Sequence, residues 1–162
     1  MNPCPCGYFG HPTRKCICSH NQVGAYLSKI SGPMLDRFDL HIEVAPVEFD
    51  HISSKEKEEC SALIRERVQR TRELQQARYK GAGITCNARI TSDVLHEICP
   101  LTDDAHNLLK TVFERMGLSA RAYDRILKVS RTVADMENSE IIEKQHIAQA
   151  VQYRSLDRKY WS

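Results

Sequence analysis

The sequence predicts a mainly α-helical protein, with a helical bundle preceded by a short irregular cysteine-rich segment and one strand. Apolar residues recur at helical spacing through residues 53–153. Residues 1–36 are instead rich in Gly, Pro and Cys and show no sustained periodicity. One stretch, 38–44, alternates apolar and polar residues as a strand does. We therefore divide the chain into an irregular part (1–50), a helical part (53–153) and a polar tail (154–162).

Composition limits the class of protein. The chain has 162 residues, 41% of them hydrophobic and 27% charged, with a net charge of +2, which is typical of a soluble globular protein. No apolar run approaches the roughly 18 residues that a membrane span needs, and no signal peptide is evident. We expect a cytoplasmic protein without a membrane partner. Its seven cysteines are then reduced thiols, metal ligands or core residues rather than disulfides.

The predicted strand follows the irregular segment. It begins at Phe38 and ends before Ala45 and Pro46. A strand this short needs a sheet to join, and we find no convincing second strand in the sequence. We therefore expect the sheet to be incomplete within this chain.

A long helix is predicted next. Ser53 and Glu56 form a capping-box pattern at its start, and the helix should end near Lys80, before two glycines. Its predicted apolar side consists of Cys60, Leu63, Ile64, Val68, Thr71 and Leu74. Residues 51–90 contain nine Lys or Arg and five Asp or Glu. This positive helix is either a solvated face or a face that meets a polyanion or an acidic neighbour.

Shorter helices follow to the end of the predicted bundle. One is capped by Thr91 or Ser92 and ends near Cys99, before a proline. A second starts at Thr102 or Asp103 and ends at Met116, with Gly117 as its C-terminal cap. A third is capped by Ser119, and a last one covers about 143–153. The predicted core stripe of the third comprises Ala122, Ile126, Val129 and Val133.

Four cysteines near the N-terminus have a pattern that fits a metal site. Cys4 and Cys6 form one Cys-x-Cys pair, and Cys16 and Cys18 form a second pair nine residues later. Residues i and i+2 of an extended segment point the same way, so each pair can offer two thiolates to a structural zinc ion. His11 and His20 are near enough to replace a cysteine. The alternative is a set of reduced, partly buried thiols in a turn-rich loop. Further along, Cys60 and Cys99 fall on apolar helix sides and are predicted to pack in the core.

Three arginines are candidates for contact with phosphate. Arg37 directly precedes the predicted strand; by spacing alone it is a surface ion-pair partner, although a guanidinium there can also stabilise a transferring phosphoryl group. Arg121 lies in the first turn of a predicted helix, and Arg125 and Lys128 follow on the same stripe. A basic stripe at a helix start can bind phosphate or simply face solvent.

Four sequence segments together resemble one protein family. They are N-P-C-P-C-G from Asn2, C-I-C-S from Cys16, I-S-G-P-M-L-D-R-F-D-L-H-I-E-V ending at Val44, and L-S-A-R-A-Y-D-R-I-L-K-V-S-R-T-V-A-D over 118–135. This set resembles the ComM-type Mg-chelatase-like proteins, which are AAA+ ATPases related to the magnesium-chelatase ATPase subunit and more distantly to MCM helicases. The resemblance extends from Asn2 to about Tyr153 and implies a helical AAA+ lid preceded by the end of the ATPase core.

The resemblance implies roles for individual residues. Asn2 corresponds to the sensor-1 asparagine, which orients the attacking water near the γ-phosphate. Arg37 corresponds to the arginine finger offered to the ATP of a neighbouring subunit, and Arg121 to the sensor-2 arginine. Arg125, which lies on the same basic stripe as Arg121, is a second candidate for contact with the nucleotide. The cysteines match a cysteine-rich insertion of the family. ATP and Mg²⁺ as cofactors, a hexameric ring and DNA as partner are implied for the full-length protein.

The chain departs from the family pattern because it contains no G-x-x-x-x-G-K-[ST] phosphate loop. Its first residues match the sensor-1 position, so we interpret it as a C-terminal portion of a longer ATPase of the DNA helicase or translocase type, inactive alone. The alternative is a non-enzymatic module, in which a zinc-binding arm and a helical bundle bind nucleic acid or protein. Nothing in the residues indicates a tetrapyrrole site for metal insertion.

Overall fold

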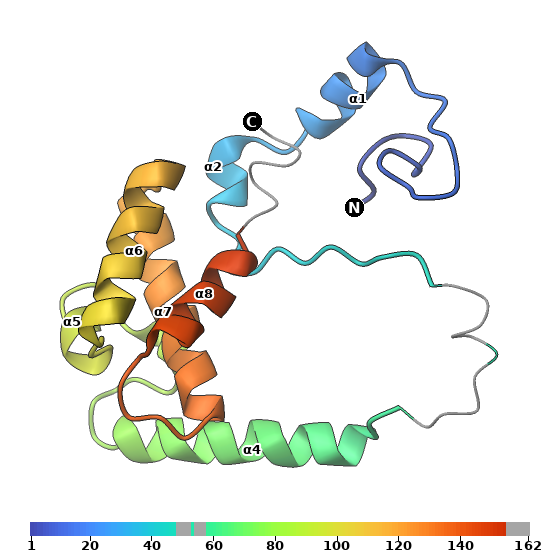
Figure 1. Ribbon diagram of the computed structural model, residues 1–162. Coiled ribbons are helices and arrows are strands. Elements are labelled where there is room, and N and C mark those ends of the chain that lie inside the picture. The colour runs from blue at the N-terminus through green and yellow to red at the C-terminus, as the bar shows by residue number, and fades with distance from the viewer. Residues whose placement is uncertain (48–52, 54–57, 155–162) are drawn as a thin grey trace. The chain divides into compact units, whose positions relative to one another are not determined.

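The computed structural model describes residues 1–47, 53 and 58–154 (Figure 1). These residues are mainly helical, which confirms the predicted fold class. The chain forms two compact units: the first combines Met1–Ser54 with Tyr153–Ser162, and the second is Lys55–Gln152. The predicted capping contact to Glu56 lies outside the described residues, as does the predicted tail from residue 155 onward.

The described residues of the first unit include the short helices α1 (His20–Leu27) and α2 (Gly32–Leu35). Ser19 starts α1 with a reciprocal capping box: its hydroxyl accepts from the Gln22 N–H (3.3 Å), and the Gln22 side chain accepts from the Ser19 N–H (2.9 Å). Val23 and Leu27 are four residues apart and therefore lie on one face of α1. Both are buried in a small cluster with Cys4.

The helices of the second unit pack mainly around one of their number, α7 (Ala120–Met136). The other elements are α4 (Ser61–Arg78), η1 (Asn87–Arg89), α5 (Leu95–Ile98), α6 (Asp103–Met116) and α8 (Lys144–Gln152). Figure 1 shows α6, α7 and α8 together, and α7 contacts α4, α5, η1 and α8. A single parallel bridge, Leu101 to Ile142, ties the segment before α6 to the segment before α8.

Local cap signals in the sequence are confirmed for α6 and α7. Thr102 accepts from the Ala105 N–H (3.3 Å) at the start of α6, and Gly117 ends that helix with a left-handed φ of 56°. Ser119 likewise accepts from the Ala122 N–H (3.2 Å) and starts α7. By contrast, the helix predicted from Thr91 or Ser92 begins only at Leu95. The Ser92 hydroxyl donates to Asp124 (2.6 Å) rather than capping a helix.

The core of the second unit lies where α6, α7 and α8 meet. The largest fully buried apolar side chains are Ile90, Leu95, Leu109, Ile126, Leu127, Ile142 and Ile147. The predicted α7 stripe is confirmed for Ala122, Ile126 and Val133, and Val129 is half-buried against the same core. This packing sets the direction of α7, whose first turn carries Arg121.

The predicted apolar side of the long helix is wrong for its first half. Leu63, Ile64 and Val68 are 55%, 41% and 45% exposed, whereas Thr71 and Gln75 are buried. The reason is that α4 packs on α7 with its second half, and no other described element covers residues 61–70. Cys60, predicted to pack in the core, is an exposed helix N-cap. Cys99, for which the same was predicted, is buried.

The predicted strand over 38–44 is also wrong. These residues form neither helix nor strand, and Leu40, Ile42 and Val44 are 48%, 66% and 85% exposed. The alternating pattern is real, but a strand forms only when a neighbouring strand satisfies its backbone groups in a ladder. Among the described residues this segment has no neighbouring strand, and its backbone is instead hydrogen-bonded at Phe38 and His41. Among the described helices, none has the length and apolar character required to cross a bilayer.

Candidate functional site

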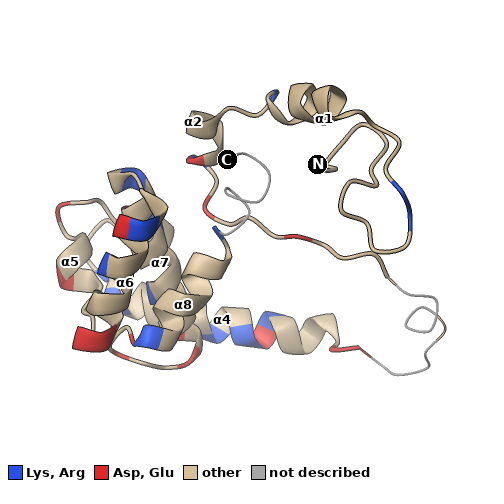
Figure 2. Cartoon of the chain, turned by 45° about the horizontal axis from the view of Figure 1, so that its top comes forward, with Lys and Arg blue, Asp and Glu red and all other residues tan. Residues whose placement is uncertain are grey.

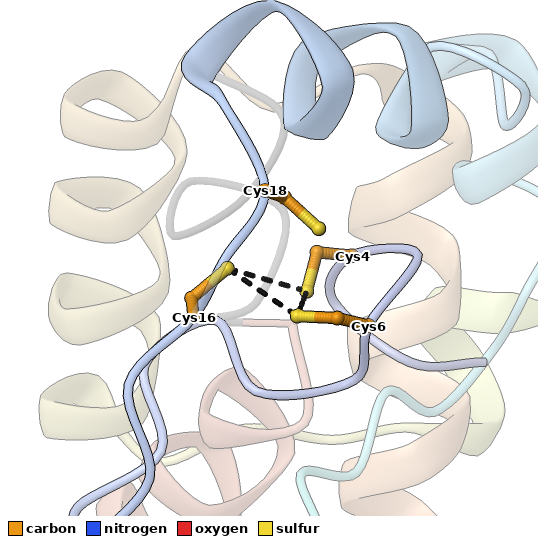
Figure 3. A group of neighbouring side chains, drawn as sticks. All are labelled: Cys4, Cys6, Cys16 and Cys18. Carbon is orange, nitrogen blue, oxygen red and sulfur yellow. Dashed lines mark hydrogen bonds between the residues drawn. The ribbon is translucent and has the colours of Figure 1, made fainter.

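The four N-terminal cysteines gather into one cluster in the first unit (Figure 3). The Sγ atoms of Cys4 and Cys6 lie 3.4 Å apart, those of Cys4 and Cys16 3.7 Å, and those of Cys6 and Cys16 3.5 Å. Cys18 completes the set, and all four sulfurs lie within 4.8 Å of one another. Figure 3 shows the four side chains converging from two stretches of the loop. The cluster could hold a metal ion.

The sulfur spacing fits a tetrahedral zinc site. Zinc–thiolate bonds are about 2.3 Å long, so the edges of a regular ZnS₄ tetrahedron measure about 3.8 Å. The three Sγ–Sγ distances, 3.4–3.7 Å, are close to this edge. Cys4 is fully buried against Val23 and Leu27 of α1, which fixes one corner of the cluster. Four protein ligands leave no position for a substrate, so a metal here would be structural.

Backbone N–H groups point at the sulfurs and favour the thiolate form that metals bind. The N–H groups of Tyr8 and Ile17 lower the pKa of Cys6 to about 6. At Cys16, the N–H of Cys18 also lowers the pKa, but desolvation and the neighbouring thiols outweigh it, so the pKa rises to about 12. Backbone N–H groups therefore favour the thiolate at Cys6, whereas desolvation and the neighbouring thiols favour the neutral thiol at Cys16.

Arg37 lies in a segment whose backbone is held on both sides. The Arg154 guanidinium, 1% exposed, donates to the Phe38 carbonyl (3.0 Å) and to the Asp36 carboxylate (3.3 Å). The His41 N–H donates to the carbonyl of Tyr153 (2.7 Å). Arg37, between the two residues that Arg154 binds, is exposed, and its side chain makes no hydrogen bond or ion pair within the described part of the chain. The result is an ordered backbone presenting a cation to solvent.

The other two phosphate candidates differ from each other. Arg121, in the first turn of α7, is exposed and has no hydrogen-bond or ion-pair partner among the residues described. Arg125, one turn later, is half-buried.

Asn2, the predicted sensor residue, is exposed. Its side chain lies over Gly7, where an added Cβ would be 3.4 Å from the Asn2 amide nitrogen. Gly7 has a left-handed φ of 83°, so the backbone conformation favours glycine there.

A buried charge network in the second unit was not predicted from the sequence. The Asp135 carboxylate, on α7, is 2% exposed and accepts from Arg78 of α4, from Arg131 (3.0 Å) and from Asn87 (2.7 Å). Asn87 also binds the hydroxyls of Tyr79 and Thr132. The spacing of Arg131 and Asp135, four residues apart, could have indicated one contact. The link from Arg78, 57 residues away, leaves no local signal.

The role of Arg154 was not predicted either, since the sequence places it at the start of a polar tail. It is instead almost fully buried and bound to the segment around Arg37. Together with the cysteine cluster, it organises the first unit around a few polar and sulfur contacts.

Comparisons with known proteins assign the family. The family model described as "Magnesium chelatase, subunit ChlI C-terminal" matches residues 58–154, and the model "Magnesium chelatase, subunit ChlI" matches residues 1–52. The chain belongs to the magnesium chelatase ChlI C-terminal family. The boundary between the two matches falls close to the division between the two structural units, at Ser54 and Lys55. The ComM-type resemblance expected from the sequence is thus confirmed.

Relatives within the magnesium chelatase-like proteins cover nearly the whole chain. "Uncharacterized protein YifB" of Escherichia coli is 40% identical over 161 residues, which is 98% of this chain. "Competence protein ComM" of Haemophilus influenzae is 40% identical over 159 residues, again 98% of this chain. An uncharacterized protein of Mycobacterium bovis is 31% identical over 153 residues, or 94% of the chain. The chain spans 30% of the length of each of these curated relatives.

Proposed function

We propose that this chain supplies arginine-finger, sensor and lid elements to a magnesium chelatase-related AAA+ ATPase. The observation that carries the proposal is a division among its arginines. Arg78, Arg131 and Arg154 are tied into buried or half-buried ion pairs. Arg37 and Arg121, the two that match the family's nucleotide-contacting positions, are exposed and unpaired within the described residues. Unpaired cations are available to the phosphates of ATP.

In this proposal Arg37 acts on ATP held by a neighbouring subunit. Arg154 binds Phe38 and Asp36, the residues on either side of Arg37, and we call these two hydrogen bonds the Arg154 clasp. Because the clasp fixes the backbone at Arg37, the conformational entropy lost when the Arg37 guanidinium binds a phosphate is small. A guanidinium placed there neutralises charge that spreads over the equatorial oxygens of the transferring phosphoryl group. A finger in trans requires a ring, which we expect to be hexameric. The phosphates themselves would be bound by residues outside these 162, since no phosphate loop is present here.

Arg121 would contact the nucleotide from the lid. It projects from the start of a helix, where the partial positive charge of the helix end adds to that of the guanidinium. Arg125 follows one turn later as a second contact. Asn2, held over Gly7, would orient the attacking water. Mg²⁺ would accompany the ATP, bound by the nucleotide phosphates and by residues outside this chain.

We further propose that the cysteine cluster holds a structural zinc ion and that the intact ATPase acts on DNA in the cytoplasm. The cluster provides four convergent sulfurs at nearly tetrahedral spacing, with N–H groups aimed at the thiolates. Zinc would cross-link the two Cys-x-Cys pairs and hold the loop in front of α1. Partnership with DNA is supported by the excess of Lys and Arg over residues 51–90 and by the family's resemblance to DNA-remodelling ATPases.

The proposal is tested by arginine substitution in the full-length protein, to which the proposal assigns the phosphate loop. Arg37→Ala is expected to lower ATP turnover by roughly 10³-fold or more, because an arginine finger contributes on that scale. Arg121→Ala should weaken nucleotide-linked lid movement. Arg89→Ala, which removes another exposed arginine from η1, is the matched control and should leave turnover unchanged. Wild-type turnover in Arg37→Ala would overturn the finger assignment.

A second candidate function is a zinc-binding module that binds nucleic acid or protein without ATP. It is favoured by the completeness of the cysteine cluster within one chain, since no neighbouring subunit is needed to build it. Turnover that depends on Arg37 in the full-length protein would exclude this candidate as the sole function.

A further inference from the structure

The segment between the two cysteine pairs, residues 7–15, folds into a tight exposed loop that we call the tip loop. Two backbone turns shape it: the Gly7 N–H donates to the Cys4 carbonyl (3.0 Å), and the His11 N–H donates to the Tyr8 carbonyl (3.1 Å). Gly10, third residue of the second turn, has a φ of 76°, which a type II turn requires. Phe9 is the second residue of that turn, and it is 40% exposed.

The rest of the tip loop is held in place by its own side chains. The His11 Nδ1 atom accepts from the N–H groups of Thr13 (3.2 Å) and Arg14 (3.1 Å). The Arg14 guanidinium lies over the Tyr8 ring at 5.2 Å and donates to the Tyr8 hydroxyl (2.7 Å). The rings of Tyr8 and His11 meet edge to face at 5.6 Å. The aromatic and basic side chains are thus ordered in advance while staying accessible.

The charge around the tip loop is of one sign. Residues 1–35 contain three Lys or Arg and no Asp or Glu. Arg14 and Lys15 are both exposed at the end of the loop. Figure 2 shows basic residues and no acidic ones along the chain from the N-terminus through α1. A stretch of chain that carries cations and no carboxylate of its own is complementary to a polyanion.

We propose that the tip loop binds single-stranded DNA. A base stacks on the exposed ring of Phe9, next to the edge of the Tyr8–His11 pair, and the flanking phosphates contact Arg14 and Lys15. Aromatic rings interleaved with cations are the usual means by which proteins bind unpaired strands, because every base offers a π face and every nucleotide a phosphate. The choice of DNA rests on the DNA partner proposed above; the stacking chemistry itself rests on the tip loop.

Single-stranded DNA fits better than a duplex or an apolar protein partner. In a duplex the base faces are already stacked, so Phe9 would have no π face to contact. A protein partner would require a wider apolar patch, yet Phe9 is the one large exposed hydrophobic side chain among residues 7–15, all of which are described. An aromatic side chain beside exposed cations indicates a charged, repeating ligand instead.

The test measures binding of a fluorescent oligothymidylate to the zinc-loaded 162-residue chain by anisotropy over a range of salt concentrations. Phe9→Leu keeps an apolar side chain but removes the ring, and it should weaken binding roughly tenfold because stacking on one base contributes on that scale. Phe9→Trp should restore affinity, and its fluorescence should be quenched when a base stacks on it. The double variant Arg14→Gln with Lys15→Gln should reduce the slope of log K against log salt by about 1.4, since each phosphate contact on a single strand contributes about 0.7.

Matched controls lie in the same unit. Ile17→Ala removes a side chain that is 86% exposed but has no π face, and Lys29→Gln removes a cation that follows α1 and lies over Tyr26 at 5.5 Å. Both should leave the dissociation constant unchanged. Zinc content measured for every variant distinguishes lost binding from a lost fold.

Three results would overturn the proposal. The first is equal affinity in Phe9→Leu and the wild type at matched zinc content. The second is binding of duplex DNA as tightly as oligothymidylate. The third is tighter binding of oligouridylate, which would identify RNA as the ligand. None of these outcomes depends on Arg37, so the ATPase proposal and the DNA-binding proposal can fail separately.

Discussion

The two units of the chain are stabilised by different kinds of contact. In the second unit, twelve buried residues form one hydrophobic cluster around α7, and the Asp135 network ties α4 to it. In the first unit, the corresponding cluster contains only Cys4, Val23 and Leu27 among the described residues, with the other three cysteines packed beside it. The structure of the first unit therefore depends on a few contacts that bury little area, namely the sulfur cluster and the hydrogen bonds of Arg154.

This difference matters for what each unit can present. A unit that hides little apolar surface can place many of its side chains in solvent, as Phe9, Arg14 and Arg37 are. Its stability must then come from contacts that need little area, such as metal ligation. The second unit gains stability from burial and can keep one helix, α7, in a fixed direction. Three further predictions test this contrast.

The largest effect is expected from removing the zinc ion that we propose for the cysteine cluster. Structural zinc contributes about 10 kcal/mol or more to small sites of this kind, so chelation should unfold the region around α1 and leave α6, α7 and α8 protected. Hydrogen exchange measured peptide by peptide, before and after chelation, reports both units in one experiment. Cys4→Ser should act as chelation does.

The matched control for Cys4 is Cys60, which is exposed and lies outside the cluster. Cys60→Ser should change neither zinc content nor exchange. Zinc stoichiometry near zero in protein purified without chelator would show that contacts other than metal ligation stabilise the first unit.

The second prediction concerns the Asp135 network. Asp135→Ala leaves the guanidinium of Arg131, which is 1% exposed, without its carboxylate, and breaking a buried pair in this way costs roughly 3–5 kcal/mol. Urea unfolding should show this loss in the second unit, with the zinc content of the first unchanged. Glu66→Ala removes the exposed partner of Arg70 and should cost under about 1 kcal/mol. Equal losses of unfolding free energy in the two variants would show that burial does not strengthen the Asp135 ion pairs.

The smallest effect is a loss of stability in alkaline solution due to Cys99. Burial raises the pKa of this thiol from 9.0 to about 11. As the pH rises, the Cys99 thiol ionises in the unfolded chain before it does so in the folded protein. Its contribution to the free energy of unfolding is therefore fully present below pH 9 and is lost as the pH rises toward 11, by at most about 1.4 kcal/mol per pH unit. Unfolding free energies at pH 8 and pH 10 should therefore differ more in the wild type than in Cys99→Ala. Tyr79 and Tyr123, whose pKa values burial also raises, are present in both proteins; the charge of the Cys99 thiolate adds to both shifts in the wild type only, and therefore acts in the same direction.

Contacts between residues close in sequence could be predicted, and contacts between residues far apart in sequence could not. The caps at Thr102 and Ser119 depend on atoms within three residues, so their patterns were sufficient. The convergence of Cys4 with Cys16 was one of two interpretations of the Cys-x-Cys pairs, because the same pattern also fits separate reduced thiols in a turn-rich loop. The buried position of Arg154 was not predictable, since its carbonyl partner lies 116 residues away.

The wrong predictions share a cause. The alternation in 38–44 and the apolar side of α4 are both typical of segments that pack against a neighbouring element. Periodicity alone does not show whether that element is present. A strand needs a second strand, and an amphipathic helix needs a covering element. The functional assignment of Arg37 and Arg121 came from the family resemblance, because an exposed arginine has no pattern of its own.

The clasp of Arg154 also has a consequence for biosynthesis. It joins residues 36–38 to a residue that follows α8, so the two halves of the first unit are separated by the entire helical unit in the order of translation. The ribosome must therefore release the helices before the Arg37 segment can take its final form. Premature termination after Gln152 would yield the helical unit without the hydrogen bonds that Arg154 makes to the backbone and side chains around Arg37.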